Sequence, residues 1–122
     1  ISNGMRVTIH QKNLEVTPAL SDFINSKLVK PLEKRLKKFE SLSPLLEIEV
    51  ARSTRHHHKG KVYHAEANLT LGGVLLRAEV DDEDVRTACD LLEKELLGEL
   101  SKHLDKTRSV TKKNARSVKG VV

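Results

Sequence analysis

Apolar residues occupy every second position over a long central part of the chain, and this pattern limits the possible folds more than any other. The segments 42–52, 61–71 and 74–80 each alternate in this way, as β-strands with one buried face do. Gly72 and Gly73 separate the last two segments, and glycine tolerates the positive φ of a two-residue hairpin turn. We therefore predict three strands that form an antiparallel meander. The inward-facing residues are expected to be Leu46, Ile48, Val50, Tyr63, Ala65, Ala67, Leu69, Leu71, Val74, Leu76, Ala78 and Val80.

A further strand and a helix are predicted before the meander. Residues 5–10 alternate as well, which is strand spacing. Thr17 and Pro18 then predict a helix start, because threonine caps a helix and proline lacks only an N–H that the first turn does not use. Pro31 predicts a kink or a break near residues 29–30, because proline cannot donate the helical hydrogen bond. The apolar residues at helical spacing are Leu20, Phe23, Ile24, Leu28, Leu32, Leu36 and Phe39.

A second helix is predicted to follow the acidic residues 81–84. Asp81 or Asp82 can cap it, and the acids of its first turn would complement the positive end of the helix dipole. From about Thr107 the chain is rich in serine and lysine and loses its periodicity, so we expect residues 107–122 to form a flexible basic tail. The inward stripe of this helix is expected to be Val85, Ala88, Cys89, Leu92, Leu96 and Leu100.

The predicted order is therefore strand, helix, three strands, helix. A helical crossover joins the first two strands, so they are most simply parallel. We predict an α+β fold, a two-layer β-α-β-β-β-α sandwich with both helices on one face of a four-stranded sheet, as in double-stranded-RNA-binding domains. A chain of 122 residues fits one domain, which we expect to span residues 1–106. Residues 1–4 precede Met5 and look like a cloning remnant or the start of a processed organellar precursor.

Basic residues gather in two places, although the whole chain is only +5. Residues 102–122 hold seven bases and one acid, a net charge of +6, whereas residues 1–101 hold fifteen bases and sixteen acids. The second cluster lies in the first helix and contains Lys27, Lys30, Lys34, Arg35, Lys37 and Lys38. Such patches attract polyanions, although many lysine-rich helix faces are only solvated. With Phe23, Phe39 and Tyr63 as the aromatics, stacking on single strands is disfavoured, which leaves folded RNA.

Other chemistry has little support in the sequence. His56, His57 and His58, with His64 nearby, are potential ligands for zinc, copper or nickel, but adjacent loop histidines point in different directions, and we expect no metal site. Cys89 lies on an apolar stripe and is expected to pack in the core; as the single cysteine it fits a reducing compartment. No paired base and nucleophile, phosphate-binding loop or membrane-length apolar run is present. We therefore expect no enzyme, cofactor, small-molecule substrate or membrane association.

The segment 7–30, VTIHQKNLEVTPALSDFINSKLVK, resembles the opening of the ribosome hibernation promoting factors. That family includes ribosome-associated inhibitor A and a plastid-specific ribosomal protein. The resemblance covers about residues 5–108 and includes the glycine turn, a D-x-x-x-A-x-D pattern from Asp84 to Asp90, and LSKHLDK at residues 100–106. Its most specific part is NLEVT, residues 13–17, in front of a helix.

The resemblance implies a factor that occupies the messenger and transfer RNA channel of the small ribosomal subunit, where it blocks initiation and protects idle ribosomes. It also implies that both helices present basic side chains to ribosomal RNA. The second helix departs from the family pattern, because an aromatic residue is usual where Arg86 stands and basic or amide residues are usual near Glu95, Gly98 and Glu99. We expect Glu95 and Glu99 to weaken its interaction with RNA. The expected RNA-binding residues are Lys27, Lys30, Lys34, Arg35, Lys37, Lys38, Arg86, Lys102, His103, Lys106 and Arg108.

The expected partners follow from the same resemblance. They are ribosomal RNA and nearby ribosomal proteins of the small subunit, bound by a monomeric domain in the bacterial cytoplasm or, alternatively, in the plastid stroma. Two other functions stay open at this point. One is binding of structured RNA away from the ribosome. The other is a protein-interaction module that uses the acidic helix and has lost RNA binding.

Overall fold

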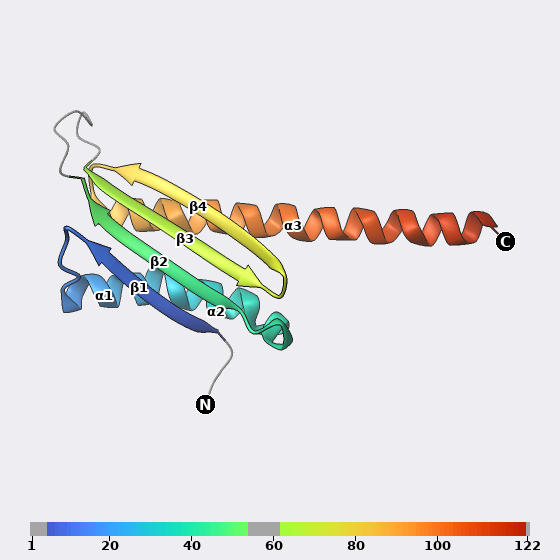
Figure 1. Cartoon of the computed structure of the whole chain (residues 1–122), viewed down its shortest axis with the longest axis horizontal. Helices are drawn as coiled ribbons and strands as arrows, with labels where there is room; N and C mark the ends of the chain where they lie inside the picture. The colour runs from blue at the N-terminus through green and yellow to red at the C-terminus, as the bar shows by residue number, and fades with distance from the viewer. Residues whose placement is uncertain (1–4, 54–61, 122) are drawn as a thin grey trace.

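The computed structural model describes the backbone of residues 5–53 and 62–121 and the side chains of these ranges up to Asp105. A mixed sheet forms one layer and the helices form the other (Figure 1). The symbol η marks a π-helix in η1 and a 3₁₀-helix in η2. The elements in chain order are β1 (Arg6–Lys12), α1 (Pro18–Ile24), η1 (Asn25–Val29), α2 (Lys30–Leu36), η2 (Lys37–Leu42), β2 (Leu45–Arg52), β3 (Tyr63–Leu71), β4 (Val74–Asp82) and α3 (Val85–Val121).

The four strands lie in the order β1-β2-β3-β4. β1 pairs with β2 in parallel, and the other two pairs are antiparallel, so the predicted crossover and meander are both confirmed. Gly72 has φ +60° in the turn between β3 and β4, a conformation that glycine adopts without strain. The two-layer α+β sandwich that the sequence predicts is the fold of this chain.

The core lies between the sheet and the helices. Alternate residues of β2 and β3 are buried, and Leu46, Ile48 and Leu69 are fully inaccessible to solvent. Leu28 of η1 and Leu92 of α3 meet them from the helical layer and are also fully buried. The opposite face of the sheet carries polar and charged residues, so the sheet is buried on one side only.

The first helical segment adapts to its proline without breaking. Its start is as predicted: the backbone N–H of Leu20 donates to Oγ1 of Thr17 at 3.2 Å. The predicted interruption near residues 29–30 takes the form of a π-helix: η1 ends at Val29, α2 begins at Lys30, and the N–H of Lys30 donates to the carbonyl of Asn25. A π-turn bonds residues five apart. The wider turn accommodates Pro31, which has no N–H and would crowd the carbonyl of a regular preceding turn.

The start of α3 corrects an expectation. β4 runs through Asp82, and the helix begins only at Val85. The cap is therefore Asp84, whose Oδ2 accepts hydrogen bonds from the backbone N–H of Thr87 at 3.0 Å and from its hydroxyl at 2.8 Å. Asp82 instead accepts from the backbone N–H of Asp84 at 3.0 Å. The acids lie before the first turn of α3 and not within it.

The helical backbone of α3 continues to Val121 and extends beyond the sheet (Figure 1). The flexibility that we expect of residues 107–122 stays a prediction. An apolar stripe is not required for helical backbone, and the lysines and arginines of this segment favour helix while proline is absent. The functional division between a domain and a basic segment at residue 106 stays a prediction.

Candidate nucleic-acid interface

Six basic side chains project from the first helical segment on the side away from the core. We call Lys27, Lys30, Lys34, Arg35, Lys37 and Lys38 the first-helix patch; all six are exposed. The ion pairs found in the described ranges use His64, Arg77, Lys94 and Lys102 as their cations, and none uses a residue of this patch. Their charges are therefore available to an anion from solution.

The C-terminal half of this patch surrounds a shallow hollow. Pro31, Lys34, Arg35, Lys37 and Lys38 line a space of about 690 Å³. Four cationic side chains around one hollow give a local positive potential, which attracts phosphate more strongly than separated charges do. The proline ring adds an apolar wall against which the lysine stems can lie. The hollow suits a polyanion backbone better than a small uncharged ligand.

Arg86 extends the basic surface from the first helical segment to α3. Its guanidinium carbon lies 5.1 Å from the centre of the Phe23 ring of α1, within the range of a cation–π contact. The resemblance to the family implies an aromatic residue at this position, where this chain has an arginine. The structure shows that this arginine is placed by an aromatic residue of the neighbouring helix.

Lys102 and His103 lie farther along α3 than this surface. Lys102 lies 3.7 Å from Glu99, one turn earlier on the same helix, and His103 is partly buried. They follow Arg86 by sixteen residues or more, which is about 24 Å along a helix. The side chains of Lys106 and Arg108 lie outside the described part of the chain, as do His56, His57 and His58.

The acids of α3 divide between two sides of the helix. Glu95 lines a hollow of about 550 Å³ with Arg77, Ala78 and Glu79, which places it beside β4. Residues two apart on a helix do not face the same side, so Glu93 points elsewhere. The expectation that Glu95 opposes RNA at the second helix therefore finds no support in its position.

Glu93 is the acid beside the first-helix patch, and sequence reasoning missed it. Burial and the Asp90 carboxylate raise the pKa of Glu93, whereas Lys94, Lys27 and Arg35 act to lower it. Lys27 and Arg35 belong to the first helical segment, and Glu93 lies on the side of α3 that carries the Arg86–Phe23 contact with this segment. The available signal was spacing: Glu93 follows Arg86 by seven residues, two helical turns on the same side.

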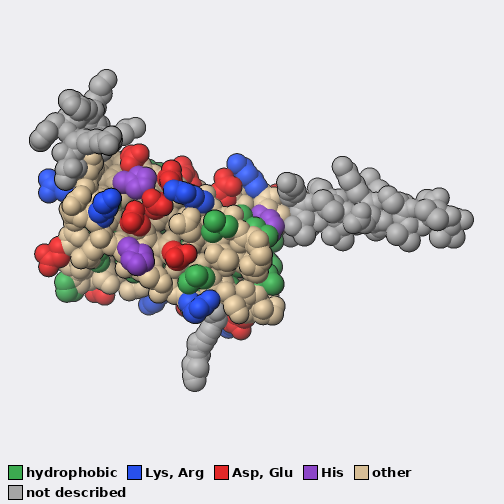
Figure 2. Space-filling model, viewed as in Figure 1, with side chains coloured by type: hydrophobic (Ala, Val, Ile, Leu, Met, Phe, Trp, Pro, Cys, Tyr) green, Lys and Arg blue, Asp and Glu red, His purple; other side chains and the backbone are tan. Residues whose placement is uncertain are grey.

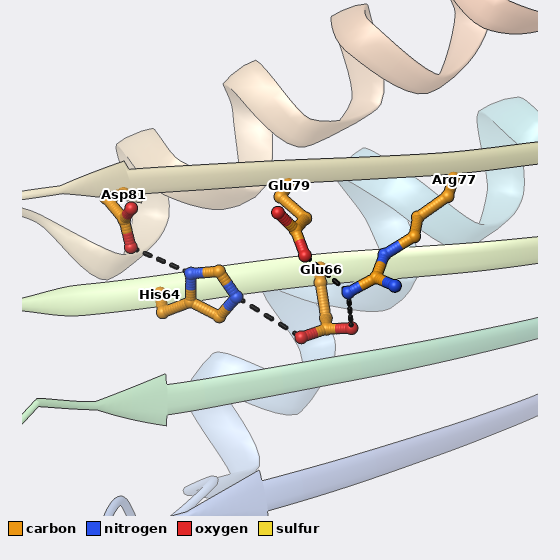
Figure 3. Close-up of polar contacts among 5 residues, drawn as sticks. All are labelled: His64, Glu66, Arg77, Glu79 and Asp81. Carbon is orange, nitrogen blue, oxygen red and sulfur yellow. Dashed lines mark hydrogen bonds and ion pairs between the residues drawn. The ribbon is translucent and has the colours of Figure 1, made fainter.

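The outer face of the sheet carries a continuous polar network (Figure 3). His64 lies 2.7 Å from Asp81 through Nδ1 and 3.2 Å from Glu66 through Nε2. Arg77 donates to Glu66 at 3.2 Å and also to Glu79. In the space-filling view, acidic, basic and histidine side chains are intermingled over this face (Figure 2). The sheet face thus neutralises its own charges, unlike the first-helix patch.

The same network contains the residues best placed to hold a metal ion. Ligand atoms of His64, Glu66 and Glu79 lie within 4.8 Å of one another. However, Arg77 already contacts the carboxylates of Glu66 and Glu79. Its guanidinium therefore supplies the positive charge that a metal ion would otherwise bring to them. Exposed carboxylates beside an arginine are sufficiently explained as a cross-strand network.

Cys89 has the environment of a core residue. It is fully buried, and burial, with a smaller contribution from Asp84, raises the pKa of its thiol to about 11. Since the thiolate is the nucleophile, this thiol is unreactive at neutral pH. No helix in the described ranges is both long and apolar enough to span a membrane.

Comparison with known proteins identifies the family. A family model described as Sigma 54 modulation protein / S30EA ribosomal protein matches residues 7–108. The ribosome hibernation promoting factors of Klebsiella oxytoca and Escherichia coli K12 are each 30% identical to this chain, over 104 and 105 residues, and each match covers 85% of this chain and 98% of the relative. The structure of a ribosomal subunit interface protein from Coxiella burnetii shares the fold, with a TM-score of 0.64 at 23% identity over 83% of this chain and 99% of that one. These matches confirm the resemblance seen in the sequence, and the chain belongs to the Sigma 54 modulation protein / S30EA ribosomal protein family, which includes the ribosome hibernation promoting factors.

Proposed function

We propose that this chain is a non-enzymatic hibernation factor that occupies the messenger and transfer RNA channel of the small ribosomal subunit. Its mechanism is steric, because a folded domain in that channel excludes the ligands of initiation. The observation that carries the proposal is the first-helix patch, whose six exposed cations take part in no ion pair within the described ranges. The membership of the family supports the ribosome as the source of the polyanion.

The proposed contact is with ribosomal RNA through its phosphates. Exposed lysines and arginines bind phosphate and release the counterions of the RNA, which makes affinity fall as salt rises. The scarcity of aromatic residues leaves recognition of folded RNA by shape and backbone. We propose that the domain acts as a monomer in the bacterial cytoplasm, associated with ribosomes; the plastid stroma is the alternative location.

The first prediction tests the patch directly. Changing Lys27, Lys30 and Lys34 together to glutamate should weaken co-sedimentation with small subunits through a sucrose cushion. The slope of log affinity against log salt should fall by roughly one for each phosphate that the variant no longer binds. All three side chains are exposed, so the fold should tolerate the change.

A charge-matched control separates the patch from net charge. Arg6, Lys12 and Arg52 are also exposed and lie on β1 and β2. Changing these three residues to glutamate alters the net charge equally and should leave most of the binding intact. Equal binding by the patch variant and the parent at every salt concentration would remove the proposed surface. Failure of the parent to sediment with ribosomes at low salt would favour a protein-interaction module.

A further inference from the structure

The two helical segments meet along a seam on the face opposite the exposed sheet. α3 packs against α1 and η1, and the Arg86–Phe23 contact at 5.1 Å shows which side of α3 faces them. Glu93 lies two turns after Arg86 on that side. We call the region bounded by Phe23, Arg86, Lys27, Glu93 and Arg35 the inter-helix seam.

Glu93 has an unusual position within this seam. Its side chain is only partly exposed, and among the described residues it makes no hydrogen bond or ion pair of ordinary length. The charged groups that act on it are Asp90 and Lys94 from its own helix, Lys27 from η1 and Arg35 from α2. Lys27 and Arg35 both belong to the first-helix patch, and Lys27 lies on η1, which packs against α3.

We propose that Glu93 limits the affinity of the first-helix patch for phosphate and so determines how tightly this chain holds ribosomal RNA. The inference rests on the proposed function. A phosphate that approaches Lys27 and Arg35 also approaches the Glu93 carboxylate, and like charges at short range repel. Partial burial keeps this repulsion from being fully screened by salt. Glu93 has this effect at the edge of the binding surface without itself being a ligand.

The proposal also sets the direction of a pH effect. Burial and Asp90 raise the pKa of Glu93, so this carboxylate gains its proton at a higher pH than an ordinary glutamate. Protonation removes the negative charge but leaves Lys27 and Arg35 cationic. The limit on affinity should therefore weaken as the pH falls from neutral into the mildly acid range.

The test compares two single variants of the same helix. Glu93→Gln removes the charge in the seam, and Glu95→Gln removes an equal charge two residues away, beside β4. Binding of the full chain to purified bacterial small subunits is measured at pH 7.5 and at pH 5.5. At pH 7.5, Glu93→Gln should bind about two- to fivefold more tightly than the parent, the size of one exposed charge interaction. Glu95→Gln should match the parent.

The pH series provides a readout that a purely structural role would not change. The advantage of Glu93→Gln over the parent should shrink at pH 5.5, whereas the ratio for Glu95→Gln should stay near one at both pH values. Equal binding by the parent and Glu93→Gln at pH 7.5, or equal gains in both variants, would overturn the inference. If the parent binds and the Lys27, Lys30, Lys34 variant does not, such a result would leave the proposed function standing. If the parent itself fails to bind small subunits, the proposed function falls and the inference with it.

Discussion

His64 joins two strands on the outer face of the sheet through both of its ring nitrogens. Asp81 of β4 lies 2.7 Å from Nδ1, and Glu66 of β3 lies 3.2 Å from Nε2. Partial burial lowers the pKa of His64, but the hydrogen bonds and charges of Asp81 and Glu66 together raise it above 6.5. A histidine whose pKa is raised by folding stabilises the fold when it is protonated. This contribution is complete below the pKa of the unfolded chain and is lost as the pH rises through the folded value.

The resulting prediction concerns the variant His64→Gln. The free energy of unfolding of the parent should exceed that of the variant by about 0.2–1 kcal/mol at pH 5.5, because both ion pairs remain partly exposed to solvent. The difference should shrink toward pH 8.5, as the imidazole loses its proton. Urea unfolding at several pH values measures it, with His10→Gln on β1 as the control. A pH-independent difference would mean that the side chain contributes only by packing.

At the residue scale, local signals were readable from the sequence and non-local ones were not. The Thr17 cap depends on its immediate neighbours, and it was predicted. The Asp84 cap depends on how far β4 extends, which is fixed by the pairing of Asp82 with Tyr63 on the neighbouring strand. Glu93 was missed for a similar reason, because its significance comes from cations that lie 58 and 66 residues earlier in the chain, Arg35 and Lys27.

At the element scale, the hydrophobic periodicity gave the strands and helices because each element must bury one face. It did not reveal the π-turn of η1 or the extension of α3. Both a π-turn and a kink can accommodate the missing N–H and the bulky ring of Pro31. Which of the two forms depends on how the flanking residues Leu28 and Leu32 pack in the core, where both are fully buried. The extension has no apolar stripe, so it leaves no periodic signal.

Two glycines lead to opposite predictions at the element scale. Gly98 lies within α3, is exposed, and has nothing within 4 Å of the position of an added Cβ. Gly98→Ala should therefore raise the free energy of unfolding by about 0.8–1 kcal/mol, because alanine loses less backbone entropy in a helix. Gly72 has φ +60°, and an added Cβ would lie 3.4 Å from Leu42 Cδ2.

The matched variant Gly72→Ala should thus lower the free energy of unfolding, since alanine does not tolerate this conformation without strain. Chemical denaturation of both variants beside the parent tests the pair. Neither glycine belongs to the first-helix patch, so affinity for small subunits should be unchanged when measured on the folded variants. A stabilised Gly72→Ala would mean that the turn relaxes to another type.

At the scale of the whole molecule, the fold separates its surfaces by charge. The sheet face balances acids with Arg77 and His64 through ion pairs, whereas no residue of the first-helix patch forms an ion pair in the described part of the chain. The sequence predicted the two-layer architecture because the order of elements and the handedness of crossovers leave few topologies. It did not predict the separation of charge, because the alternation of a strand assigns side chains to a face but does not show which partners they meet there.

The last prediction concerns the basic segment beyond the described side chains. Ending the chain after Asp105 removes six bases and no acid, and the remaining sixteen bases and seventeen acids give a net charge of −1. The core residues of α3 end at Leu100, and the partly buried Leu104 is retained, so the free energy of unfolding should stay close to that of the parent. Binding to small subunits should weaken, and the salt slope should fall by about 0.7–0.9 for each phosphate that the shortened chain no longer binds.

A full-length control separates charge from length in this experiment. Changing the six bases to glutamine keeps the chain intact and should reproduce the loss of salt dependence. The six residues are Lys106, Arg108, Lys112, Lys113, Arg116 and Lys119. If both variants retain the salt slope of the parent, the segment does not bind phosphate, and the first-helix patch with Arg86 must supply the whole electrostatic attraction. If only the truncated chain binds weakly, the segment contributes through its length and not through its charge.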